Sequence, residues 1–147
     1  MGTVTAVPGT VTALRRYPVK SMLGEAPTDV RVGERGLAGD QMFAVLGAGD
    51  AIGSAKHPRK WAPLLRCHGR LTGPGAVRVE LPDGTVLSAG AAELDARLSD
   101  LLGRQVSVSD KPPGHGALER AVPAYEGGLP DVLRATAAPD ETGDLIT

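Results

Sequence analysis

A lysine and a serine stand side by side in a short polar loop near the start of the chain. The loop reads Tyr17-Pro-Val-Lys-Ser-Met-Leu-Gly-Glu25, so Lys20 and Ser21 lie between a rigid proline and a permissive glycine. A lysine ammonium offers positive charge and three donors, a serine hydroxyl adds one donor, and backbone amides of a turn can complete a phosphate site. These residue types predict an anion-binding loop, while an ordinary solvated turn has a similar composition.

A second cluster of positive charge follows at residues 56–61, in the sequence Lys-His-Pro-Arg-Lys-Trp. Lys56 and Arg59 are candidates for the opposite wall of the same anion site. The alternative is a solvated charged face, with Trp61 in the core or at its rim. His57 is isolated in the sequence and does not by itself indicate a metal site, so we predict none.

Residues suited to catalysis are few. The sequence contains no Gly-x-Ser-x-Gly elbow, phosphate-binding P-loop, His-Glu-x-x-His helix or paired-carboxylate signature. Asp40, next to Gln41, is the best single acid–base candidate, and Tyr17 and His57 are further candidates for proton transfer. A turn or capping role is the alternative for Asp40.

The elements that must position these residues are short. Gly and Pro are frequent (20 and 12 of 147 residues), which favours many turns. Val77-Arg-Val-Glu-Leu81 alternates apolar and charged residues before Pro-Asp-Gly, which predicts an antiparallel hairpin with residues 85–87. Leucines and alanines at helical spacing predict one helix over residues 91–102, ended by Gly103.

Further strands are predicted over residues 11–17, 28–32, 42–46 and 106–108. The pattern predicts a mostly β (α+β) fold, a small β-barrel of short antiparallel strands with that one helix, although periodicity alone fits a sandwich equally.

Charge and composition restrict the class of protein. The chain has 16 Lys and Arg against 17 Asp and Glu, a formal net charge of −1, which argues against nucleic acid as a partner. Ten of those cations, against five acids, lie in residues 1–70, whereas residues 119–147 hold two cations and six acids.

No apolar run reaches the roughly 18 residues of a membrane span, and residues 1–6 do not resemble a signal peptide, so we expect a cytoplasmic protein. The single cysteine, Cys67, is expected to be a buried free thiol.

The order of these motifs resembles a known family. Gly9-Thr-Val-Thr-Ala-Leu-Arg-Arg-Tyr-Pro-Val-Lys-Ser-Met-Leu-Gly-Glu25, followed by Arg35-Gly-Leu-Ala-Gly-Asp40 and Phe43-Ala-Val45, is similar to the N-terminal β-barrel domain of MOSC (molybdenum cofactor sulfurase C-terminal) proteins. The similarity continues through Pro58-Arg-Lys-Trp61, the turn at Asp83-Gly84 and Leu101-Leu-Gly-Arg104. It implies a barrel domain over residues 1–110. Residues 111–147 are then an irregular, acidic tail or the start of a linker to a MOSC domain.

The resemblance also implies a ligand. In this family the two domains together hold a molybdopterin-type cofactor, and Lys20 and Ser21 fall on positions that contact it. Gln41 stands where the family has an arginine, which removes a fixed charge and a bidentate donor and should weaken the binding of phosphate or pterin. The cysteine that ligates molybdenum belongs to the MOSC domain, and Cys67 does not match its position.

Two hypotheses about function follow. The first is a binding module for a small anionic, pterin-phosphate-like ligand, or a docking half for a MOSC-type partner, with Lys20, Ser21, Gln41, Lys56 and Arg59 as the binding residues. The second is a cofactor-independent enzyme of isomerase or cyclase type in the barrel mouth, which uses Asp40, Tyr17 or His57. A deep apolar pocket would favour the enzyme, and a shallow basic groove would favour the binding module.

Overall fold

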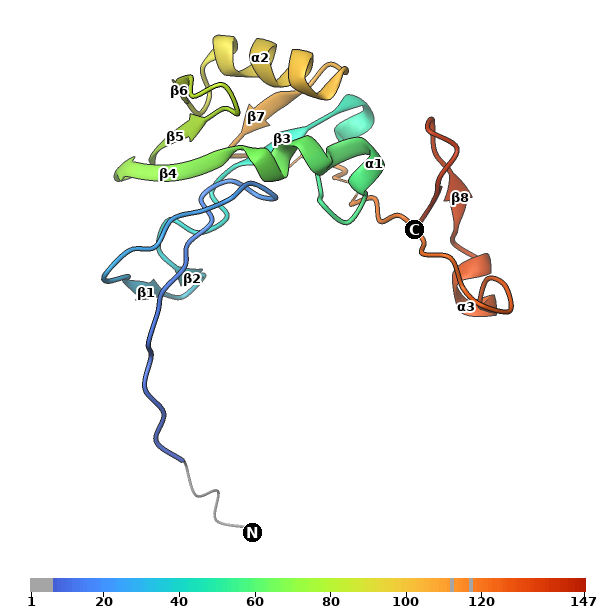
Figure 1. Cartoon of the computed structure of the whole chain (residues 1–147), viewed down its shortest axis with the longest axis horizontal. Helices are drawn as coiled ribbons and strands as arrows, with labels where there is room; N and C mark the ends of the chain where they lie inside the picture. Colours follow the sequence, from blue (N-terminus) through green and yellow to red (C-terminus); the bar gives the residue numbers. More distant parts are fainter. Residues whose placement is uncertain (1–6, 112, 117) are drawn as a thin grey trace.

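The chain folds mostly into short antiparallel strands with few helices (Figure 1). The structure, a computed structural model, describes residues 7–111, 113–116 and 118–147. Its strands are β1 (Val32–Gly33), β2 (Gly36–Leu37), β3 (Ala44–Leu46), β4 (His68–Gly73), β5 (Ala76–Glu80), β6 (Val86–Ser88), β7 (Ser107–Ser109), β8 (Ala138–Pro139) and β9 (Leu145–Ile146). Its helices are α1 (Pro58–Trp61), α2 (Ala92–Leu102) and α3 (Asp131–Arg134), with 3-10 turns at Ala48–Asp50 and Ala62–Arg66.

The largest sheet is β4-β5-β6, and it contains the predicted hairpin. β5 pairs antiparallel with β6 in the register Val79↔Leu87, and its alternating valines are buried on one face. The turn between them is fixed by Asp83, whose carboxylate accepts the Thr85 N–H at 2.9 Å. The sequence prediction of this hairpin is confirmed.

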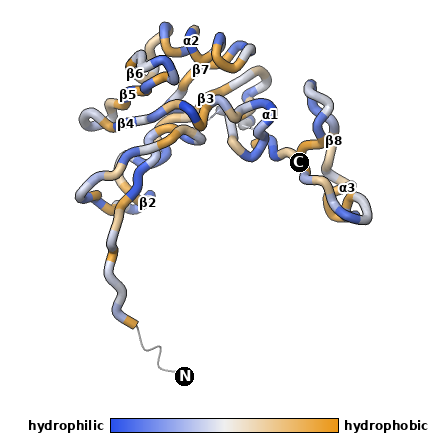
Figure 2. Tube along the Cα trace, in the orientation of Figure 1, coloured by the Kyte–Doolittle hydropathy of each residue, from blue (hydrophilic) through white to orange (hydrophobic). Residues whose placement is uncertain are grey.

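The predicted helix is also confirmed, as α2. Leu94, Leu98 and Leu102 are buried at a spacing of four residues, so they form one face of the helix. Figure 2 shows hydrophobic and hydrophilic residues alternating along it. Gly103 ends α2 in the left-handed conformation (φ 65°), where a residue without Cβ is favoured. The helix packs on β7 and β6.

Residues 19–23 form a connecting segment between the β4-β5-β6 sheet and a second sheet, β3-β7. β3 pairs antiparallel with β7, and Phe43, just before β3, bridges in parallel to Val19. Leu23 in turn bridges in parallel to His68 at the start of β4. Pairing thus runs from β6 through β4 and residues 19–23 to β7. Among the described residues no pairing joins β7 back to β6, so the predicted barrel is not confirmed.

One hydrophobic core lies between these strands and α2. Its side chains come from β3, β5, β7, α1, α2 and the segments next to them, and all are 9% exposed or less: Val19, Met22, Phe43, Val45, Trp61, Leu64, Cys67, Val77, Val79, Leu81, Leu94, Leu98, Leu102, Val106 and Val108. Cys67 is buried, as expected. Within the part of the chain that the structure describes, no helix is long and apolar enough to cross a bilayer.

Two predicted strands differ in the structure. Of residues 28–32, only Val32 belongs to a strand, β1. Residues 11–17 form no strand, and only Arg16 makes a bridge, to Glu25. Residues 7–15 extend away from the body (Figure 1), where Val11 is 76% exposed and bridges to no described residue. Strand propensity therefore has no effect there, since a strand needs a partner.

The tail carries short elements of its own. β8 and β9 pair antiparallel, and Ile146 also bridges to Ala121. The tail returns to the body where the Ala121 N–H donates to Lys56 O at 3.0 Å. Figure 1 shows α3 and β8 to one side of the main sheets, beyond α1.

Candidate functional site

The loop that carries Lys20 and Ser21 is closed by its two ends. Arg16 and Glu25 exchange both backbone hydrogen bonds, at 3.0 and 2.9 Å. Glu25 Oε1 also accepts from Arg16 Nε at 2.9 Å and from the Leu71 N–H at 3.1 Å. Gly24 is needed here because a Cβ would lie only 2.1 Å from Arg16 O. The loop is therefore a tightly fixed bend.

Backbone contacts place Lys20 beside Gln41. The Gln41 N–H donates to Tyr17 O at 2.8 Å, and the Lys20 N–H donates to Phe43 O at 2.9 Å. Pro18 O accepts from both Met42 and Phe43. Residues separated by about twenty positions are therefore adjacent. Lys20 and Gln41 must be adjacent if both bind the same ligand, as the sequence predicts.

Lys20 and Gln41 line one surface hollow of about 350 Å³. Lysines and an aspartate give it charge, and mostly apolar residues form its walls: Lys20, Gln41, Met42, Phe43, Ala44, Ile52, Ser109, Asp110, Lys111, Pro113 and Leu118. Two lysines against one aspartate give this Lys20 hollow a formal charge of +1. Among the described residues no carboxylate lies within 4.0 Å of the Lys20 ammonium. The hollow thus combines an unneutralised cation with an apolar surface.

The backbone at this hollow is strained. Ser21 has φ 64° and Gln41 has φ 50°, a region that residues other than glycine rarely adopt. Such residues cost about 1–3 kcal/mol each and tend to cluster at functional sites. Three described non-glycine residues have a positive φ. One of them, Gln41, lines the Lys20 hollow, and another, Ser21, follows Lys20 directly.

The other predicted binding residues lie elsewhere. Ser21 Oγ accepts the Ala55 N–H at 3.0 Å, so its hydroxyl ties the loop to the segment before α1 and does not line the hollow. Lys56 is exposed outside the hollow. Arg59 is also outside, where its Nε lies 3.0 Å from Asp144 Oδ2 in the tail. Of the five predicted binding residues, the structure brings Lys20 and Gln41 together.

The three acid–base candidates have different surroundings. Asp40 Oδ1 accepts the Tyr17 N–H at 2.7 Å, which is the turn role that the sequence left open. Tyr17 is 42% exposed. His57 is completely buried, and its Nε2 lies 2.6 Å from Asp140 Oδ2. Asp40 thus contacts Tyr17 through the backbone, whereas the His57 side chain binds Asp140 of the tail.

His57 instead anchors the acidic tail. Asp140 has a side chain only 2% exposed, and its Oδ1 accepts from Thr142 N and Oγ1 at 2.8 and 2.7 Å. Burial alone would raise the pKa of Asp140, but hydrogen bonds from Thr142 and His57 outweigh burial and hold the pKa well below its ordinary value. An ionised carboxylate only accepts hydrogen bonds, so His57 Nε2 is the donor.

Lys60 binds two further acids of the tail. Its ammonium lies 2.8 Å from Glu119 Oε2 and 2.6 Å from Glu141 Oε1, with only 5% of the side chain exposed. Burial alone would lower the pKa of Lys60, but these hydrogen bonds outweigh burial and raise it. The sequence did not indicate this cluster, because its partners are 59 or more residues apart. The opposite charges of residues 1–70 and 119–147 were its only signal.

Part of this cluster has the composition of a metal site. His57, Glu119 and Asp140 each place one potential ligand atom within 4.8 Å of the others. The Lys60 ammonium already neutralises Glu119, and His57 already donates to Asp140. The cluster therefore holds the tail through the Lys60–Glu119 ion pair and the His57–Asp140 hydrogen bond, while His57 Nδ1 is buried without a partner among the described residues.

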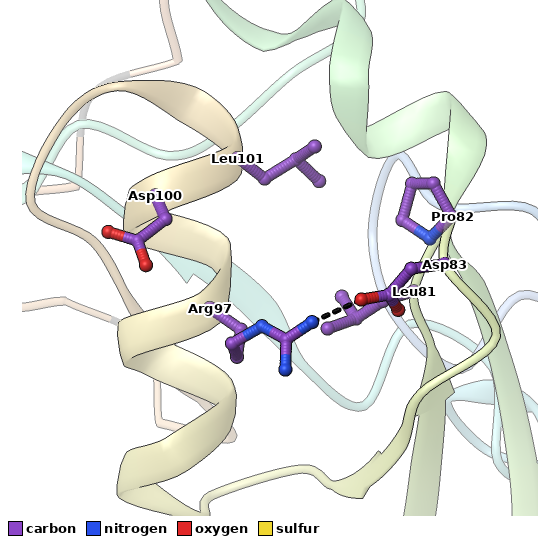
Figure 3. A pocket seen from close by; sticks show the side chains of 6 residues that line it. All are labelled: Leu81, Pro82, Asp83, Arg97, Asp100 and Leu101. Atoms are coloured by element: carbon purple, nitrogen blue, oxygen red, sulfur yellow. Dashed lines mark hydrogen bonds and ion pairs between the residues drawn. The ribbon is translucent and has the colours of Figure 1, made fainter.

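Two other hollows carry charges. One of about 650 Å³ adjoins the Lys20 hollow through Gln41, Met42 and Asp110, and mixes Arg31 and Arg35 with acids. Another, of about 310 Å³, lies between α2 and the turn after β5 (Figure 3). Its one cation, Arg97, is paired with Asp83. The Lys20 hollow differs from the first because its walls are largely apolar, and from the second because no carboxylate pairs with Lys20 among the described residues.

The fold and site thus define a small antiparallel β protein with a cationic, partly apolar hollow at the junction of its two main sheets. No family model matches the chain, and no curated protein or solved structure is significantly similar to it. Membership of the MOSC family accordingly stays a prediction.

Proposed function

We propose that the chain is a binding module for a small anionic ligand, held in the Lys20 hollow with its anionic group against the Lys20 ammonium. The observation that carries the proposal is the partly buried Lys20, which lines the hollow with no carboxylate within 4.0 Å among the described residues. A cation of this kind gains most from a ligand that supplies the missing negative charge.

The walls of the hollow favour a ligand with a flat apolar part. Met42, Ile52 and Leu118 line it together with Lys20 and Lys111. A volume of about 350 Å³ lies in the range of about 300–1,000 Å³ of small-molecule sites. A phosphomonoester of a ring system such as a pterin combines both properties. In a molybdopterin-type cofactor, Lys20 and Lys111 would face the phosphate and the apolar wall would face the ring.

We also propose that the fold is an open barrel like the N-terminal module of a MOSC protein. We infer that residues 19–23 join two sheets, the pair of β3 with β7 and the sheet of β4, β5 and β6, into an open barrel. α2 then covers the remaining gap. The order of pairing, and the packing of α2 on both β6 and β7, support this inference. A barrel that holds a phosphate at the Lys20 loop would agree with the N-terminal module of a MOSC protein.

Calorimetric titration with a pterin phosphomonoester tests the proposal. Lys20→Ala should weaken binding about 10- to 100-fold, because a hydrogen bond to a charged group contributes about 1.5–3 kcal/mol. Lys56→Ala is the matched control, since Lys56 is an exposed lysine outside the hollow and its loss changes the net charge equally. Equal affinities of the two variants would reject the proposal.

A second variant tests the role of Gln41. Gln41→Arg returns a guanidinium to the edge of the hollow, where it can bind phosphate with two donors. We expect it to bind the pterin phosphomonoester about tenfold more tightly than the wild type. Weaker binding by this variant would show that the phosphate does not lie near residue 41.

A further inference from the structure

Another cavity, of about 250 Å³, lies next to α1 and shares no lining residue with the Lys20 hollow. The residues that matter in this Trp61 pocket are Lys60 and Trp61 of α1, Arg104 and Gln105 after α2, and Glu119 and Glu141 of the tail. Trp61 is completely buried. Lys60 Nζ and Arg104 Cζ lie 5.9 and 5.8 Å from the centroid of its ring, so two cations adjoin one indole.

A carboxylate of the chain itself lies between these cations. Glu141 Oε1 is 2.6 Å from Lys60 Nζ and 3.0 Å from Arg104 Nη1. The Glu141 side chain is 59% exposed, whereas that of Lys60 is 5% exposed. Glu119, with 16% exposure, is a second and deeper partner of Lys60. Glu141 is thus an acid at the mouth of the pocket, held by cations that lie further in.

The pocket also retains unused donors. Trp61 Nε1 and Arg104 Nε are both buried and have no hydrogen-bond partner among the described residues. Buried polar groups are normally satisfied, so two unpartnered N–H groups in one pocket call for an explanation. Both are donors, and both belong to residues that line the cavity with the two cations. The missing partner is therefore an acceptor.

We propose that Lys60, Trp61 and Arg104 form a binding site for a small oxyanion, a carboxylate or a phosphate, and that Glu141 is its displaceable internal occupant. When the Glu141 side chain leaves, Lys60 and Arg104 face Glu119 alone, which gives the pocket a formal charge of +1. An incoming oxyanion restores neutrality. It also brings additional acceptor oxygens within reach of the unused N–H groups.

Displacement requires little rearrangement. Two other residues also anchor the tail loop to the body, because Asp140 binds His57 and Asp144 binds Arg59. Glu141 can therefore rotate out while the loop stays docked. Ion pairs of an exposed side chain are weak because water and salt screen them. An oxyanion in solution can compete with such an occupant.

Fluorescence of Trp61 gives a direct test, because Trp61 is the only tryptophan in the chain. Wild type, Glu141→Ala and Glu141→Ala/Arg104→Ala are titrated with inorganic phosphate and, separately, with acetate, at an ionic strength held constant by sodium chloride. Glu126→Ala is the matched control, since it removes one exposed tail carboxylate outside the pocket. Circular dichroism verifies that each variant is folded.

We expect Glu141→Ala to bind phosphate or acetate about three- to tenfold more tightly than the wild type and Glu126→Ala, because no internal carboxylate competes. The double variant should lose this response. The tighter of the two anions identifies the class of ligand. The proposal is overturned if Glu141→Ala responds no more than Glu126→Ala, or if the double variant keeps the full response. Lys20→Ala should leave the Trp61 response unchanged, which separates this site from the Lys20 hollow.

Discussion

Replacing Gly24 by alanine should destabilise the loop that carries Lys20. An added Cβ would lie 2.1 Å from Arg16 O and 2.8 Å from Tyr17 Cδ1, so the two ends of the loop must separate. Separation breaks the two backbone hydrogen bonds between Arg16 and Glu25. At about 0.5–1.5 kcal/mol each, their loss lowers the free energy of unfolding by about 1–3 kcal/mol. For a domain of this size that corresponds to a Tm lower by about 2–12 °C.

Thermal unfolding followed by circular dichroism measures this effect. Gly9→Ala is the matched control, because a Cβ at Gly9 has nothing within 4 Å. Its Tm should equal that of the wild type within about 1 °C. Gly24→Ala should also bind phosphate less tightly, since the same bend positions Lys20. A Tm for Gly24→Ala equal to that of Gly9→Ala would refute the steric reasoning.

Two further predictions follow from buried titratable groups. The pKa of Asp140 is lowered in the folded protein, so its ionisation stabilises the fold above the unfolded pKa of about 3.9, and this contribution is lost as the pH falls further. The wild type should accordingly have a higher Tm than Asp140→Asn at neutral pH, and the difference should shrink below about pH 4; a difference independent of pH would contradict the assignment. Burial raises the pKa of Cys67 to about 11, so a thiol reagent at about pH 8 should label the native protein far more slowly than the protein in concentrated guanidinium. Equally fast labelling of both would show that Cys67 is accessible.

The parts of the fold that the sequence predicts are those fixed by local chemistry. The alternation of residues 77–81 determines both the face that β5 buries and its partner across the Pro-Asp-Gly turn. The leucines of α2 and the glycine after it likewise determine a helix and its end. In both cases the residues that specify the element are neighbours in the sequence.

The predictions fail or remain incomplete where distant contacts decide. Residues 11–17 have the composition of a strand, but among the described residues only Arg16 has a bridging partner, and Val11 remains 76% exposed. The Lys20 hollow could be anticipated only in part, because Lys111 reaches it through the pairing of β7 with β3. Neither spacing nor residue type indicated that His57 would be buried against Asp140, which is 83 residues away.

The most direct test of the central claim uses the side-chain amides. The chain has two glutamines, Gln41 and Gln105, and no asparagine, so each amide is a reporter for a different cavity. In an NMR titration with inorganic phosphate, the Gln41 amide signals of the wild type should shift and saturate, and in Lys20→Ala they should shift only at much higher phosphate concentration. Gln41 signals that stay fixed in the wild type, or that shift equally in both proteins, would contradict an anion site at Lys20.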